Sequence, residues 1–114
     1  MQEGLKMKIL LITPAADPEK RTNKGLMMPQ LALYILQGLT PKRHEVEIIE
    51  EETEDIDLET ECDLVAISCM TANAPRAYEL CHEFKQRGKT VVIGGVHPTI
   101  LPDEAAQHAD CVVV

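Results

Sequence analysis

The chain has 114 residues, of which 45% are hydrophobic, a length and composition that suit one globular domain with a single core. A formal net charge of −8 argues against a nucleic-acid partner, because contacts to phosphates need clustered Lys and Arg. No run approaches the roughly 18 apolar residues of a membrane span, and the apolar stretch near the start is too short for a signal peptide, so we expect a cytoplasmic protein.

Apolar runs rich in β-branched residues alternate with segments whose apolar residues recur at helical spacing. In chain order they predict a strand at 7–13, a helix at 29–39, strands at 44–50 and 62–68, a helix at 73–88, a strand at 90–95, a short helix at 101–109 and a strand at 110–114. This alternation predicts an α/β fold with a parallel sheet and right-handed crossovers. Five strands favour a flavodoxin-like (Rossmann-like), doubly wound sheet in the order 2-1-3-4-5.

The apolar spacing also predicts which side chains share a helix face. On the first helix the shared face consists of Leu31, Tyr34 and Ile35. On the second helix it consists of Ala77, Leu80, Cys81 and Phe84. Asn73 opens the second helix and Gly88 closes it.

Neither the acidic residues nor the cysteines predict a site. Ten of the nineteen acidic residues fall between Glu45 and Glu61, a clustering that favours a solvated edge or loop over an acidic partner site. The four cysteines form no CxxC pair, so neither a zinc ribbon nor an iron–sulfur cluster is predicted within the chain. Cys62, Cys81 and Cys111 stand in or beside apolar segments, and we expect them to be core residues.

Ligands of an open parallel sheet bind outside the carboxyl ends of the strands, where the strand order reverses. For the order 2-1-3-4-5 this crevice lies between the first and third strands. Residues 14–28, which follow the first strand, form a long loop of a kind that is typically functional or disordered, and we expect it to be partly disordered without a ligand. The candidate binding residues of the crevice are Thr13, Pro14, Ser68, Cys69, Met70, Thr71, Gly94, Gly95, His97 and Pro98.

The stretch GGVHPTILP, residues 94–102, follows the fourth strand. Gly94 and Gly95 allow the backbone to approach a neighbour closely or to adopt a positive φ, and Pro98 and Pro102 stiffen the turn. The motif alone leaves a ligand site and a plain turn equally open. If Gly95 serves a ligand, its replacement by valine should cost little stability, whereas a positive-φ turn predicts a larger loss.

The strand ends restrict the class of ligand. Thr13 is followed by Pro14 and two alanines rather than by the hydroxyl-rich loop that holds a flavin phosphate. Thr13 and Ser68 stand where a two-component receiver has acidic residues, and the chain contains neither GxGxxG nor a P-loop. Small hydroxyls, methionines and glycine backbone suit a large, flat molecule decorated with amides.

The segments MKILLITPA, CDLVAISCMTANAPRAYEL and above all GGVHPTILPDEA resemble the amino-terminal cobalamin (B12)-binding domain of B12-dependent radical S-adenosylmethionine (SAM) enzymes. Relatives of the anaerobic magnesium-protoporphyrin IX monomethyl ester cyclase show the nearest pattern. The resemblance covers nearly the whole chain. It implies that residues 1–114 are one cobalamin-binding domain, cut before a radical SAM barrel of the same polypeptide.

The resemblance further implies that the domain positions cobalamin, while the iron–sulfur cluster and SAM belong only to the downstream barrel. No catalysis is then expected from this chain alone, and the parent enzyme would be of the methyltransferase or cyclase type. A cofactor-free structural or interaction module of the same fold is the alternative.

One departure from other cobalamin proteins concerns the axial ligand. The loop after the first strand contains Asp17 and Glu19 but no histidine, so the DxHxxG motif of methionine synthase and the mutases is missing. We expect cobalamin to bind without a histidine from that motif. For His97, which lies after the fourth strand, a hydrogen-bonding role that pins the loop is favoured over metal ligation, and no metal ligand is predicted.

Overall fold

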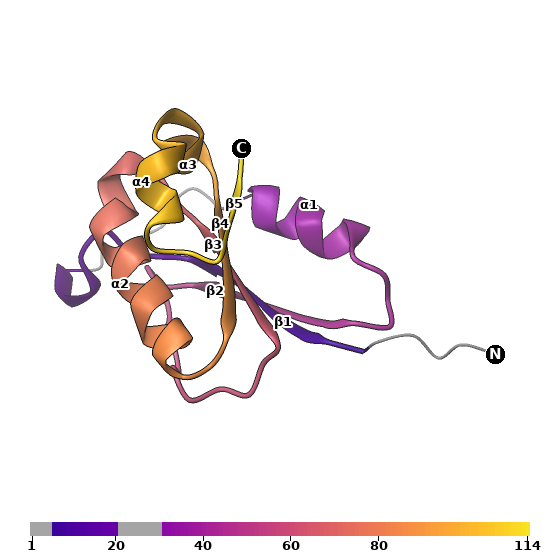
Figure 1. Cartoon of the computed structure of the whole chain (residues 1–114). Helices are drawn as coiled ribbons and strands as arrows, with labels where there is room; N and C mark the ends of the chain where they lie inside the picture. The colour runs from indigo at the N-terminus through magenta and orange to yellow at the C-terminus, as the bar shows by residue number, and fades with distance from the viewer. Residues whose placement is uncertain (1–5, 21–30) are drawn as a thin grey trace.

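The computed structural model describes residues 6–20 and 31–114 (Figure 1). Its strands are β1 (Lys8–Thr13), β2 (Glu45–Glu50), β3 (Leu64–Ser68), β4 (Thr90–Gly94) and β5 (Cys111–Val113). Its α-helices are α1 (Leu31–Leu39), α2 (Ala74–Gln86), α3 (Val96–Ile100) and α4 (Pro102–Ala106), and two 3-10 turns are η1 (Pro18–Lys20) and η2 (Thr71–Asn73). None of the described helices is long and apolar enough to cross a membrane.

The five strands form one sheet in the order β2-β1-β3-β4-β5, and every neighbouring pair is parallel. Both features confirm the predicted fold class. The register aligns Ile12 with Ile67, and Ile67 with Ile93, across the three central strands. Because side chains alternate between the faces of a strand, these three isoleucines lie on one face of the sheet.

That face carries the hydrophobic core. The helices α2, α3 and α4 lie on one side of the sheet, and α1 lies on the other (Figure 1). The predicted buried face of α2 is confirmed, since Ala77, Leu80, Cys81 and Phe84 are all fully buried. Phe84 and Leu80 pack in one cluster with Ile12, Ile67 and Ile93. A dry, continuous core therefore fixes α2 against the central strands.

The face of the sheet beneath α1 is less well covered. Alternation places Ala66, Val92 and Cys111 there, and the first two are half-buried while Cys111 is exposed. The expectation that Cys111 is a core residue is therefore wrong. It lies on β5, the outermost strand, where no further strand of the described residues covers it.

The predicted shared face of α1 is wrong at the two members whose side chains the structure describes, Tyr34 and Ile35. Leu33 is buried, whereas Tyr34 and Ile35 are 44% and 52% exposed. The helix sequence LALYILQGL has a single polar side chain, Gln37, so its apolar spacing could not select one face over another.

Two loop predictions change. Residues 96–100, expected to be loop, form the short helix α3 directly after β4. Of the long loop predicted at 14–28, the structure describes residues 14–20, which contain η1, and the expectation of disorder without a ligand falls mainly on residues outside the described part.

Candidate functional site

The predicted site residues come together at one edge of the sheet. Thr13, Ser68 and Gly94 are the last residues of β1, β3 and β4, and Ser68 pairs in register with Gly94. Because all strands are parallel, their carboxyl ends share one edge. The remaining predicted residues follow directly in the three connecting segments. The structure therefore brings all of them to the carboxyl edge of the sheet, at or directly after the ends of β1, β3 and β4.

The conformation of Gly95 decides between a ligand site and a plain turn at the glycine pair. Its φ is +114°, and a Cβ at this position would lie 2.7 Å from the carbonyl oxygen of Cys69. The amide of Cys69 donates to the carbonyl of Gly94 over 2.8 Å, and the amide of His97 donates to the carbonyl of Cys69 over 3.1 Å. The close neighbour of Gly95 is thus the protein backbone itself. Of the two readings, the positive-φ turn applies, and it predicts the larger stability cost for a side chain at Gly95.

His97 pins the segments around this edge to one another, as favoured from its position. The residue is only 7% exposed. Its Nδ1 lies 3.2 Å from Thr71 Oγ1, and its Nε2 lies 3.2 Å from Glu104 Oε1. The hydrogen bond to His97 holds the pKa of Glu104 below its usual value. Both ring nitrogens are therefore occupied, which leaves neither for a metal ion.

Three other predicted residues are buried in the same region. Pro14, Cys69 and Pro98 belong to the largest fully buried side chains. Burial raises the pKa of the Cys69 thiol to about 11, so this sulfur stays protonated near neutral pH and is a poor metal ligand. These buried residues support the carboxyl edge from inside the domain. The predicted residues that remain accessible at the edge are Ser68, Met70, Thr71, Gly94 and Gly95.

Asn73 joins the segments that follow β1 and β3. This side chain is buried, its Oδ1 accepts the amide N–H of Met70 over 2.8 Å, and its Nδ2 donates to the carbonyl of Pro14 over 3.0 Å. The sequence marked Asn73 only as the start of a helix. Its partner Pro14 is 59 positions away, so no local pattern could have indicated the bridge.

Glu51 fixes the loop after β1 from the other side. Although it belongs to the acidic cluster expected to be solvated, it is only 3% exposed. Its Oε1 accepts the amide N–H of Ala15 over 2.9 Å and the Nε–H of Arg76 over 3.0 Å. The hydrogen bond with Glu51 raises the pKa of Arg76. This buried ion pair links the loops after β1 and β2 to the first turns of α2.

At the carboxyl edge, several exposed side chains are apolar, and the buried side chain of Thr13 is polar. Met70, Val96 and Ile100 are exposed, and the last two are four residues apart on α3 and so share a face. At the base, the hydroxyl of Thr13 is buried without a hydrogen-bond partner in the part of the chain that the structure describes. Buried polar atoms in native proteins are almost always paired, so this hydroxyl points to a missing polar partner.

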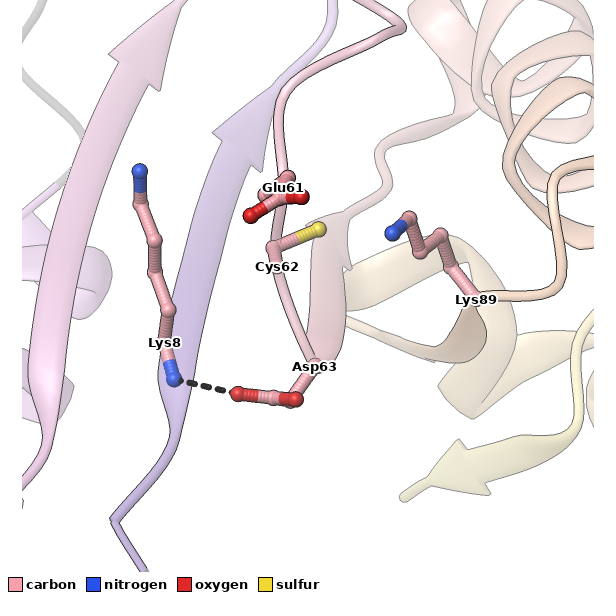
Figure 2. Close-up of a pocket in the computed structure, with 5 residues that line it drawn as sticks. All are labelled: Lys8, Glu61, Cys62, Asp63 and Lys89. Atoms are coloured by element: carbon pink, nitrogen blue, oxygen red, sulfur yellow. Dashed lines mark hydrogen bonds between the residues drawn. The ribbon is translucent and has the colours of Figure 1, made fainter.

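A pocket lies at the opposite edge of the sheet. Figure 2 shows its lining residues, Lys8, Glu61, Cys62, Asp63 and Lys89, which stand at or before the amino ends of β1, β3 and β4. There the amide of Lys8 donates to Asp63 Oδ2 over 2.8 Å, so this carboxylate caps a strand. Among the described residues, no group of three or more His, Cys, Asp or Glu side chains could hold a metal ion. The carboxyl edge is therefore the candidate site.

Comparisons with known proteins give one family model and several methyltransferases. The family model described as B12 binding domain matches residues 21–114. Bacteriochlorophyllide d C-8(2)-methyltransferase of Chlorobaculum tepidum is 48% identical over 85 residues, which cover 74% of this chain and 19% of that protein. Bacteriochlorophyllide d C-12(1)-methyltransferase of the same organism is 36% identical over 114 residues, which cover 98% of this chain and 25% of that protein.

A more distant relative, an uncharacterized methyltransferase of Pyrococcus horikoshii, is 28% identical over 116 residues, or 93% of this chain and 25% of that protein. The chain thus spans about a fifth to a quarter of the length of these relatives. No solved structure matches it.

Proposed function

This chain belongs to the B12-binding domain family, and from that premise we propose that it binds cobalamin at the carboxyl ends of its strands. The observation that carries this placement is the buried, unpaired hydroxyl of Thr13 at the base of the edge. Cobalamin is a flat macrocycle whose rim bears primary amides, and an amide N–H is the donor that such a hydroxyl lacks. The residues at the edge therefore fit the cofactor.

Each group of edge residues has its own part in this proposal. The hydroxyls of Thr13, Ser68 and Thr71 hydrogen-bond amides of the cofactor, and the exposed apolar side chains Met70 and Val96 contact its flat surface. Gly94 lies at the same edge, and Gly95 acts indirectly, because its positive φ and close approach to Cys69 hold the segments after β3 and β4 together. The buried residues Pro14, Cys69, His97 and Pro98 act indirectly, because they hold the three connecting segments in place.

Cobalamin binds here without a histidine ligand from the loop after β1. Residues 14–28 contain no histidine, and both ring nitrogens of His97 are engaged by Thr71 and Glu104. The cofactor supplies the chemistry when it is bound, and the domain orients it.

The longer protein to which such a domain belongs is, in our proposal, a radical SAM methyltransferase in the cytoplasm. Two relatives are named as methyltransferases of bacteriochlorophyllide, and the chain spans only a fifth to a quarter of their length. The iron–sulfur cluster and SAM would then be held by a downstream domain, which would also be a partner of this one.

Retention of hydroxocobalamin after desalting tests the binding proposal. We expect the wild-type chain to keep about one corrinoid per chain, seen as its absorbance bands. Ser68→Trp should remove most of this retention, because the large ring fills the base of the crevice. Lys89→Trp, at the opposite edge, is the matched control and should retain the cofactor. A folded wild-type chain that releases all corrinoid would favour the cofactor-free module instead.

A further inference from the structure

Two buried oxygen atoms without partners lie on neighbouring strands at the candidate site. They are Thr13 Oγ1 and Glu50 Oε1, neither of which has a hydrogen-bond partner among the described residues. Thr13 and Glu50 are the last residues of β1 and β2 and are paired in register. Register partners in a parallel pair project to the same face of the sheet, so the two side chains stand side by side at the carboxyl edge.

The face is the one covered by α1. The residues that precede them, Ile12 and Ile49, belong to the core on the opposite face, and successive side chains alternate. From α1, the hydroxyl of Tyr34 donates to Glu50 Oε2 over 2.9 Å. That contact orients the carboxylate and leaves Oε1 as the free acceptor.

The neighbouring Glu51 differs from Glu50, because its Oε1 has hydrogen-bond partners within the protein. Its Oε1 accepts from Ala15 and Arg76, so that carboxylate is neutralised by a guanidinium within the protein. No salt bridge of Glu50 with a cation is found among the described residues, and its partner Tyr34 is a neutral donor. Among the described residues, Glu50 Oε1 and Thr13 Oγ1 therefore have no donor, and a ligand at the carboxyl edge would supply one.

We propose that Glu50 and Thr13 together recognise one primary amide of a corrin ring. The inference rests on the proposed binding of cobalamin and extends it to Glu50. An amide NH₂ group has two donor hydrogens, which match one carboxylate oxygen and one hydroxyl oxygen. A carboxylate at the same place on the ligand would have no hydrogen to donate and would be repelled by Glu50. The pair thus selects an amide over an acid.

The first experiment measures the affinity of the whole chain for hydroxocobalamin. Glu50→Gln replaces an acceptor oxygen by an NH₂ group of the same shape, and we expect its dissociation constant to rise about tenfold, as for loss of one charge-assisted hydrogen bond. Thr13→Val removes the hydroxyl at nearly constant volume and should weaken binding in the same direction. Glu47→Gln makes the identical change at an exposed position of β2 and should leave affinity unchanged.

The second experiment changes the ligand. Cobalamin monocarboxylic acids, in which one primary amide is hydrolysed, should bind the wild-type chain more weakly than hydroxocobalamin for the acid isomer that faces Glu50. Glu50→Gln should reduce or reverse that preference, since a glutamine can donate to the acid. A merely structural role of Glu50 would lower affinity for both ligands alike and so would overturn the inference.

Cobinamide, which keeps the corrin amides and lacks the nucleotide tail, identifies the part of the cofactor involved. Glu50→Gln should weaken cobinamide and cobalamin by the same factor, and a loss confined to cobalamin would overturn the corrin assignment. Equal affinities of Glu50→Gln and Glu47→Gln for hydroxocobalamin would sink the role of Glu50 while leaving the proposed function intact. Failure of the wild-type chain to bind either ligand would instead refute the proposed function.

Discussion

Gly95 shows how one residue can join two loops by having no side chain. Its positive φ and its contact with the backbone of Cys69 bring the segments after β3 and β4 together. Gly94, the preceding residue, is different, because a Cβ there would make ordinary van der Waals contacts with Val113 Cβ at 3.4 Å and the Val113 carbonyl oxygen at 3.5 Å. The two adjacent glycines therefore respond differently to the same substitution.

We predict that Gly95→Ala destabilises the domain by about 1–3 kcal/mol, since the new Cβ needs both an unfavourable φ and a shift of the Cys69 backbone. Gly94→Ala, the matched control, should cost much less. Equilibrium denaturation of both variants measures the difference. Equal free energies of unfolding would show that the conformation of Gly95 is not strained.

The cysteines lead to a second prediction at this scale. Burial raises the pKa of Cys69 to about 11 and that of Cys81 to about 12, whereas Cys111 is exposed. Iodoacetamide at pH 8 should modify Cys111 in the native chain and reach the buried thiols only after unfolding. Mass spectrometry of digested protein locates the labels. A Cys111→Ser chain that still reacted in its native state would contradict the assignment.

At the scale of elements, α2 is joined to the turn after α4 by a stack of aromatic and imidazole rings. Tyr78 of α2 stacks on His108 with 4.0 Å between ring centroids, and His82 Nε2 lies 3.0 Å from His108 Nδ1. The amine of Lys85 donates to the carbonyl of His108 over 3.2 Å. Burial lowers the pKa of His108 below its ordinary value, and the charge of His82 acts in the same direction.

This shift makes stability depend on pH. Between its lowered folded pKa and the ordinary value of 6.5, His108 binds more protons in the unfolded chain than in the folded one. The contribution is fully present above that window, and it is lost as the pH falls through it. We therefore predict that the free energy of unfolding falls as the pH drops below about 6.5. The decrease should be smaller in His108→Gln, and an identical pH profile for the two chains would rule out His108 as the source.

The elements differ in how far their sequence reveals them. Apolar runs rich in β-branched residues predicted all five strands, and three of these runs are nearly unbroken, as expected for strands covered on both faces. The order was predicted from the number of strands, because five favour the flavodoxin-like arrangement. The helix α3 was missed since it has five residues and includes Pro98, so contacts such as the hydrogen bond from Leu101 N to His97 O decide it rather than propensity.

The residues of the candidate site also differ in how far the sequence reveals them. The rule that ligands meet carboxyl strand ends was enough to place Thr13, Ser68 and Gly94 on one edge. It could not find Glu51 or Asn73, whose partners in the loop after β1 lie 36 and 59 positions away. Residues that work through long-range hydrogen bonds leave no periodic signal in a sequence.

For the whole molecule, the exposed apolar surface of α1 contrasts with the net charge of −8. Ile35 and Leu39 are 52% and 77% exposed on a helix without a charged residue. Such surface is more typical of a contact with another structure than of a face in water.

We predict that Ile35→Lys and Leu39→Lys each change the free energy of unfolding by no more than about 0.5 kcal/mol, because little apolar burial is lost. They should also reduce the binding of a hydrophobic dye such as ANS. Leu33→Lys, at the buried position of the same helix, should destabilise strongly. A loss of stability in all three variants would mean that the exposed side chains already pack within the domain.

Among the described residues, β2 and β5 are the outer strands of the sheet, and outer strands are where sheets of different molecules can join into aggregates. Along β2 the exposed Glu45 and Glu47 place negative charges beside that edge, and a second copy of this acidic chain would be repelled there. Edge-to-edge growth along β2 is therefore opposed by this charge.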